Sequence, residues 1–174
     1  MGDNNNALAG NLPKKPNSAL KKLDRLVGKW REFGDAEGTA EFEWMEGGFF
    51  LIQRFEFHMG ERRFKGVEYV GFDEDTKTLR SHLMDNAGHN FTYTWDIEGD
   101  TLTIWFGERG SDNFYQGKFS KDGDTFCGRW QWPEGGGKIG GFELNETRIP
   151  ENKDAKKKIS NGNLPPKKNA KSNQ

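Results

Sequence analysis

The sequence predicts one all-β domain, a single antiparallel up-and-down barrel of about 9–10 strands with a short N-terminal helix. Residues that favour tight turns recur about every 11–13 residues, which leaves room for strands and little else. The turn segments are Glu46–Gly48, Gly60, Asp73–Asp75, Asn86–Gly88, Glu98–Asp100, Gly107–Asp112, Asp122–Asp124 and Pro133–Gly137. Apolar and polar residues alternate between these turns, so each strand has one buried face. Closing the meander removes its exposed edges, and a β-sandwich is the alternative.

The two ends of the chain differ from its middle. Residues 1–17 and 151–174 are rich in Asn, Lys and Pro and contain the related sequences GNLPKKPN and GNLPPKKN. Both are expected to be disordered tails around a barrel domain at 18–150. From Glu151 onward seven lysines stand against two acidic residues, which leaves the barrel with a net negative charge. No specific nucleic-acid binding is therefore expected.

One short helix precedes the strands. It is expected at 19–27, with Ser18 as its N-cap and Gly28 as its end. Its apolar stripe consists of Leu20, Leu23, Leu26 and Val27. No run of about 18 apolar residues predicts a membrane span, and the N-terminus lacks the pattern of a secretory signal. The single cysteine, Cys127, fits a reducing compartment, so the expected location is the cytoplasm.

The interior of the barrel is expected to be aromatic. Hydrophobic residues make up only 32% of the chain, but 13% of all residues are Phe, Trp or Tyr. Each ring removes on the order of 150–250 Å² from water, so a few rings replace many aliphatic side chains. Barrels of about this size are either just filled by side chains or hold one small ligand. A pocket walled by rings is therefore the predicted site.

Residues near the two ends of the strand series resemble the signature of lipocalin-like barrels. Gly28, Lys29 and Trp30 form the Gly-x-Trp that opens the first strand there, and Arg148 stands where those proteins place a basic side chain against this Trp. EWMEGGFFLIQRFEF, YVGFDEDT, MDNAGH and GKFSKDGDTFCGRWQW, within 26–148, are similar to a bacterial lipocalin-like family of unknown function. The resemblance implies a calycin-type barrel and no demonstrated reaction. The haem-binding nitrobindin-like barrels share the Gly-x-Trp, but the other segments do not resemble theirs and no His lies near the last strand.

Polar residues that share a face with the rings are the candidates for ligand contacts. Gln53 lies in phase with Phe55, and Glu68 lies in phase with Phe64 and Val70. An unpaired carboxylate inside a barrel is costly, so Glu68 either anchors a ligand or pairs with a basic residue. The candidate partners are Arg54, Arg80 and Arg129. The predicted ligand-binding residues are Trp44, Gln53, Phe55, Glu68, His82, Tyr93, Trp95, Tyr115 and Trp130.

No motif for catalysis, cofactor or metal binding stands out. The three histidines lack the spacing of zinc ligands, and no cofactor is predicted. His58 and His89 lie beside turns and are expected to be exposed, whereas the pattern leaves the orientation of His82 open. Ser81 and His82 point to opposite faces of a strand, so they cannot act as nucleophile and base.

Three functions remain open. The first is binding of a small apolar or aromatic ligand in the barrel interior, with Gln53 and Glu68 fixing its orientation. The second is a scaffold or homodimer that uses outward-facing apolar residues such as Val67 and Tyr69. The third is a small-molecule enzyme with Glu68 or His82 as general base. The sequence contains no nucleophile motif or cofactor fingerprint that supports a specific reaction.

Overall fold

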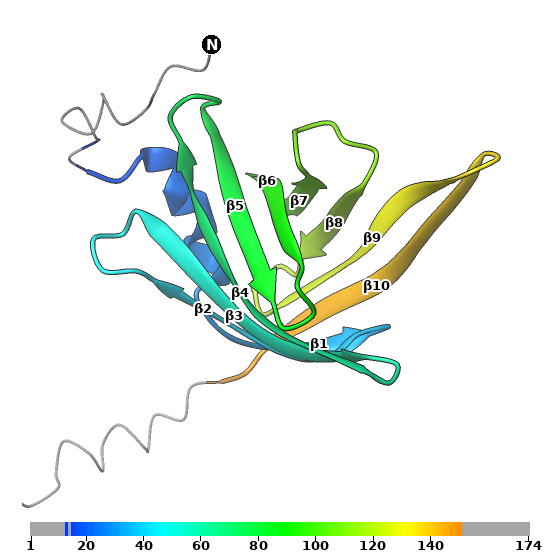
Figure 1. Ribbon diagram of the computed structural model, residues 1–174. Coiled ribbons are helices and arrows are strands. Elements are labelled where there is room, and N and C mark those ends of the chain that lie inside the picture. The colour runs from blue at the N-terminus through cyan, green and yellow to red at the C-terminus, as the bar shows by residue number, and fades with distance from the viewer. Residues whose placement is uncertain (1–12, 14, 151–174) are drawn as a thin grey trace, which may run out of the picture.

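The computed structural model describes Pro13 and residues 15–150 of the 174-residue chain. The two predicted tails lie outside the described residues, apart from Pro13 and 15–17. The strands are β1 (Gly28–Gly34), β2 (Glu37–Trp44), β3 (Phe50–Met59), β4 (Arg62–Asp73), β5 (Thr78–Asp85), β6 (Asn90–Glu98), β7 (Thr101–Phe106), β8 (Phe114–Phe119), β9 (Thr125–Gly135) and β10 (Lys138–Arg148). Each strand pairs antiparallel with the next, and β10 pairs with β1 (Figure 1). The predicted fold class is confirmed, and the sandwich alternative is wrong.

The hairpin turns follow the predicted turn segments with two differences. The β1–β2 connection at Asp35 and Ala36 was not predicted; the carboxylate of Asp35 accepts the backbone N–H of Glu143 at 2.8 Å, which supports this turn. The β9–β10 hairpin is longer than expected, because β9 continues through Pro133. A register shift between Lys138 and Ile139 accompanies this extension, and the hairpin extends beyond the rest of the barrel (Figure 1).

The predicted helix exists as a 3₁₀ helix, η2 (Ser18–Leu26), which lies across one end of the barrel. Its N-cap is Asn17 rather than Ser18: the Asn17 side chain accepts the backbone N–H of Ala19 at 2.9 Å. Three residues of the predicted stripe are buried, namely Leu20, Leu23 and Leu26, whereas Val27 is 36% exposed. In the described part of the chain no helix is long and apolar enough to cross a membrane.

Side chains of η2 connect it to strands on two sides of the barrel. Asp24 accepts the indole N–H of Trp44 on β2 at 2.9 Å. Lys22 forms an ion pair of 3.1 Å with Asp96 on β6, and Arg25 donates to the carbonyl of Gly99 at 2.8 Å. These contacts hold the apolar face of η2 over the barrel, so this end is closed.

Trp30 is the centre of the closed end. It is fully buried, and its indole N–H donates to the carbonyl of Leu26 at 2.7 Å. The guanidinium of Arg148 lies 4.2 Å from the centre of the Trp30 ring and donates to the carbonyls of Val27 and Arg25. Gly28 has φ +127°, and a Cβ there would lie 2.7 Å from Arg148. The structure therefore confirms the expected placement of Arg148 against Trp30.

Candidate ligand-binding site

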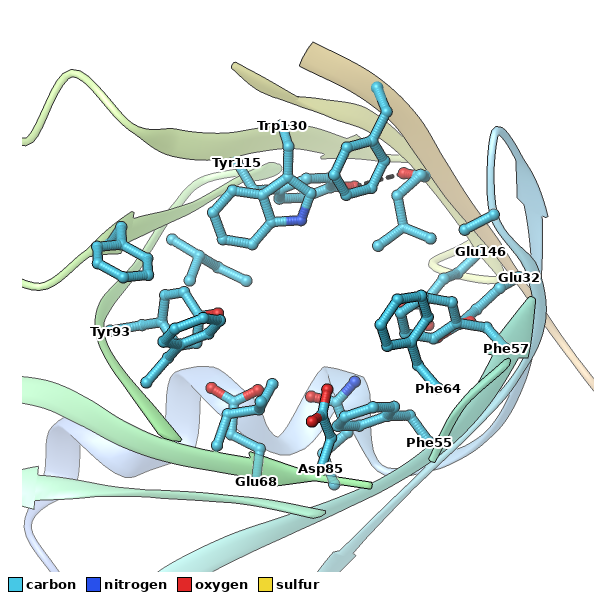
Figure 2. A pocket seen from close by; sticks show the side chains of 18 of the residues that line it. Glu32, Phe55, Phe57, Phe64, Glu68, Asp85, Tyr93, Tyr115, Trp130 and Glu146 are labelled. Atoms are coloured by element: carbon cyan, nitrogen blue, oxygen red, sulfur yellow. Dashed lines mark hydrogen bonds between the residues drawn. The ribbon is translucent and has the colours of Figure 1, made fainter. Parts of the chain in front are cut away.

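The barrel encloses a cavity of about 530 Å³ between η2 and the opposite, open end (Figure 2). Its size lies within the roughly 300–1,000 Å³ that is usual for sites of small ligands. The cavity exists because inward residues of ten strands surround more space than the rings fill, and η2 covers only one end. Its wall is built mainly from aromatic side chains, namely Phe42, Phe55, Phe57, Phe64, Phe91, Tyr93, Trp95, Phe106, Tyr115, Phe126, Trp130, Trp132 and Phe142.

The rings contact one another around the wall. Phe57 and Phe64 on β3 and β4 have ring centres 5.3 Å apart, and Tyr93 and Trp130 from β6 and β9 are separated by 5.6 Å. Tyr115 lies 5.8 Å from Trp130, and its hydroxyl donates to the carbonyl of Leu144 on β10 at 3.0 Å. Ring pairs at these distances attract each other beyond their shared burial. The wall therefore keeps its shape around the empty space.

Seven of the nine predicted ligand-binding residues line this cavity: Gln53, Phe55, Glu68, Tyr93, Trp95, Tyr115 and Trp130. The other two lie elsewhere. Trp44 ends β2 at the closed end, where it bonds Asp24. His82 lies exposed on the outer face of β5, and its imidazole contacts the side chain of Asn90. These two residues were wrongly assigned to the cavity.

Glu68 is buried with neutral partners. The indole N–H of Trp95 donates to Glu68 Oε1 at 3.3 Å and to Ser81 Oγ at 2.9 Å. Burial raises the pKa of Glu68 to about 7, although the hydrogen bonds with Ser81 and Trp95 act in the opposite direction.

Of the two alternatives for Glu68, the ion pair with a basic residue is absent among the described residues. Arg54 pairs with the exposed Glu43 at 3.2 Å, and the half-buried Arg80 pairs with the exposed Glu108 at 2.7 Å. Arg129 is exposed as well. No salt bridge among the described residues includes Glu68, so its carboxyl group remains available to the cavity.

A second acidic feature, which was not predicted, lies where the barrel closes. Glu32 on β1 and Glu146 on β10 are directly opposite each other, line the cavity and are each 3% exposed. One carboxyl oxygen of each, Oε2, has no hydrogen-bond partner among the described residues. Burial raises the pKa of Glu32 to about 7; burial and then the charge of Glu32 raise the pKa of Glu146 well above its usual range. Alternation along β1 and β10 could have predicted this feature. Glu32 and Glu146 follow the inward-facing Trp30 and Leu144 by two positions, so they point to the same face.

His89 and Asp85 form a polar contact at the open end. The His89 side chain is 42% exposed, in line with the expectation, and its ring also stacks between Phe64 and Phe91, with ring centres at 5.9 and 4.9 Å. Its Nδ1 lies 2.7 Å from Asp85 Oδ2. Burial alone would raise the pKa of Asp85, but hydrogen bonds from His89 and Ala87 hold it below its usual range. His58 is exposed, as predicted.

The charges of the cavity are one-sided. Among the described residues that line it are Glu32, Glu68, Asp85 and Glu146, together with His89, but neither lysine nor arginine. No group of three or more His, Cys, Asp or Glu side chains in the described part of the chain is placed to hold a metal ion. The site is thus an aromatic chamber with carboxyl groups on two of its walls.

Comparisons with known proteins reveal a family and a similar fold. A family model described as "Protein of unknown function (DUF1579)" matches residues 15–105, which include Glu32, Glu68, Asp85 and His89. A search of curated proteins found no match. Among the solved structures that match, the crystal structure of Rv2717c from M. tuberculosis is 16% identical in sequence, with a TM-score of 0.49. That match covers 78% of this chain and 100% of the other.

Proposed function

The chain belongs to the DUF1579 family, whose function is unknown, and we propose that its barrel binds a small apolar or aromatic ligand in the interior. The observation that carries this proposal is the cavity of about 530 Å³ with its aromatic wall. Burial of apolar ligand surface contributes roughly 25 cal/mol per Å², and flat rings offer that surface at little cost in conformational entropy. Gln53 and Glu68, which share the wall with the rings, would fix the orientation of the ligand.

Fluorescence titration with N-phenyl-1-naphthylamine, an uncharged apolar probe, tests the proposal. We expect saturable binding with energy transfer from the tryptophans of the wall, and native mass spectrometry of the protein purified from cells should show the added mass of one bound ligand.

Two variants locate the probe. Ile104→Trp adds a ring inside the cavity and should weaken probe binding at least tenfold, whereas Lys118→Trp adds the same ring on the outer face of β8 and should not. Binding that is absent, or that is equal in both variants, would refute the proposal.

A second candidate function is general-base catalysis by Glu68. One observation favours it: this carboxyl group lines the cavity, and burial raises its pKa to about 7, near the pH at which a base is most effective. His82 is not a candidate because it lies outside the cavity. A rate of proton abstraction from 5-nitrobenzisoxazole that increases with pH through about 7 and is lost in Glu68→Gln would support it. A rate no higher than that in buffer would remove it.

A further inference from the structure

The pair of carboxyl groups at the seam between β1 and β10 indicates which class of ligand the cavity takes. We propose that the ligand is an organic cation, a protonated amine on an apolar or aromatic body, whose N–H groups are held between Glu32 and Glu146. This inference rests on the proposed binding of a ligand in the cavity and names the chemistry of that ligand.

The geometry of the seam brings the two carboxyl groups together. Glu32 and Glu146 are partners in the antiparallel register of β1 and β10, and Figure 2 shows both side chains on the same side of the cavity. Cβ atoms of such partners lie about 4.5–5.5 Å apart. Both Oε2 atoms are buried and lack a hydrogen-bond donor among the described residues. Two acceptors without donors therefore lie in neighbouring residues of the same cavity wall.

In the described part of the chain, the strands around the pair supply no positive charge to it. On β2 the residue opposite Glu32 is Gly38, and on β9 the residue opposite Glu146 is Phe126. On β8 the titratable neighbour is Tyr115, whose hydroxyl donates to a backbone carbonyl and whose pKa burial and Glu146 raise. The remaining titratable groups among the described residues that line the cavity are Glu68, Asp85, His89 and Tyr93.

Lys29 and Arg31, the basic neighbours of Glu32 on β1, are exposed, and the basic residues at the ends of η2 and β10 are bound elsewhere. Arg148, two positions after Glu146 on β10, donates to the carbonyls of Val27 and Arg25 and to Asp124. Arg25 of η2 lies over the ring of Phe119 and donates to Gly99. A ligand that brings its own positive charge and N–H donors would satisfy the pair, because hydrogen bonds between charged groups are the stronger kind.

The rest of the cavity fits an organic cation better than a metal ion. Zinc sites in proteins use three or four side-chain ligands, and the described residues hold no group of three or more His, Cys, Asp or Glu side chains placed for a metal ion. The rings of Phe57 and Phe64 lie beside the two glutamates in Figure 2, and Trp130 and Tyr115 lie on the adjoining wall. Aromatic faces attract ammonium groups and bury the apolar body of the ligand.

The protonation of the pair makes the binding depend on pH. Burial raises the pKa of Glu32 to about 7, and burial together with the charge of Glu32 raises the pKa of Glu146 well above its usual range. Below this range both carboxyl groups are neutral and attract a cation weakly; as the pH increases, the pair loses a proton and attracts it strongly. The affinity for a cation should therefore increase between about pH 6 and pH 8.

Two probes of the same shape test the inference by isothermal titration calorimetry. 1-Naphthylmethylamine is a cation in this pH range, and 1-naphthylmethanol is its uncharged counterpart. At pH 8 we expect the amine to bind at least tenfold more tightly than the alcohol. Between pH 6 and pH 8 the affinity for the amine should increase at least tenfold, and the affinity for the alcohol should stay constant.

Variants assign the preference to the pair. The double variant Glu32→Gln/Glu146→Gln should bind both probes within about threefold of each other, and Glu143→Gln, on the exposed face of β10, should keep the full preference. Equal binding of both probes by the unchanged protein would overturn the cation inference and leave the proposed function standing. Binding of neither probe would overturn both. The pH series on the unchanged protein decides the matter even if the double variant fails to fold.

Discussion

The two ends of this barrel are built from the same ten strands but differ in how far their side chains are buried and hydrogen-bonded. At the closed end Trp30 is fully buried, bonds the carbonyl of Leu26 and lies against Arg148. At the open end Phe106 is 39% exposed and Ile139 on the β9–β10 hairpin 63% exposed. One covering element, η2, accounts for the difference. Stability should therefore reside mainly at the closed end, and ligand binding at the open one.

The walls of the cavity differ in a similar way. Glu68 has Trp95 and Ser81 as partners, whereas Glu32 and Glu146 face each other with one unbonded oxygen apiece. Buried carboxyl groups without cations lower the stability of a protein in their charged form. Such groups are typically retained where a ligand or a reaction uses them, so the unpartnered wall is the more informative one for function.

The largest expected effect separates the two ends. Trp30→Ala should lower the free energy of unfolding by about 3–5 kcal/mol, because it leaves a cavity beneath η2 and removes the ring against which Arg148 packs. Phe106→Ala at the open end should lower it by less than about 1 kcal/mol. Urea unfolding followed by tryptophan fluorescence measures both. Similar losses in the two variants would contradict the contrast between the ends.

The next effect is on the dependence of stability on pH. The pKa of Glu32 in the folded protein, about 7, exceeds its ordinary value of 4.5, so between these values the folded state binds more protons than the unfolded state. The associated stability is present below pH 4.5 and is lost as the pH increases through 7; it amounts to about 3 kcal/mol for one such group. Glu68 acts in the same window.

Urea unfolding at pH 5 and pH 8 tests this effect. The protein should be less stable at pH 8, and Glu32→Gln should reduce the difference. The carboxyl groups with lowered pKa values, such as Asp96, titrate below this window and do not mask it. Equal or greater stability at pH 8 would show that burial does not raise the pKa of the carboxyl groups between β1 and β10.

A smaller effect concerns Arg148 and its contacts at the closed end. Arg148→Met keeps most of the side chain's length but removes the hydrogen bonds to the carbonyls of Val27 and Arg25 and the charge over Trp30. We expect a loss of about 2 kcal/mol in the free energy of unfolding, because hydrogen bonds from charged donors are lost. Thermal unfolding measures it. A loss no larger than that of Lys118→Met, on the outer face of β8, would show that the contacts of Arg148 do not stabilise the closed end.

The smallest effect on stability is expected at the open end. His89→Ala removes a ring stacked between Phe64 and Phe91 and should cost less than about 1 kcal/mol. The affinity for N-phenyl-1-naphthylamine should nevertheless decrease severalfold, since His89 lines the cavity. A large loss of stability with unchanged binding would reverse the assignment of roles to the two ends.

The alternation of residues predicted much of this architecture, because side-chain phase along a strand is local information. It placed Gln53, Glu68 and Trp95 inside correctly. It did not decide which face of β5 points inward, because both faces of that strand mix apolar and polar residues. In the structure Leu79 and Ser81 point inward, while His82 points outward.

Contacts that form only when the barrel closes could not be predicted from the local residue pattern. The pairing of Glu32 with Glu146 joins residues of the first and last strands, and the register of that seam follows from the whole ring. Trp44 was misplaced because alternation gives the face of a residue but not its height along the barrel axis. The contact of the partly exposed His89 with the cavity rings was missed because a position beside a turn does not reveal stacking on neighbouring rings.

The central claim is that the interior of the barrel takes a ligand, and nuclear Overhauser effects between a bound probe and methyl groups test it most directly. With N-phenyl-1-naphthylamine bound, we expect contacts to the methyl groups of Ile104 and Leu144, which line the cavity, and none to Ile139 on the exposed hairpin. Contacts confined to Ile139 or other outer residues, or no saturable binding, would contradict the claim.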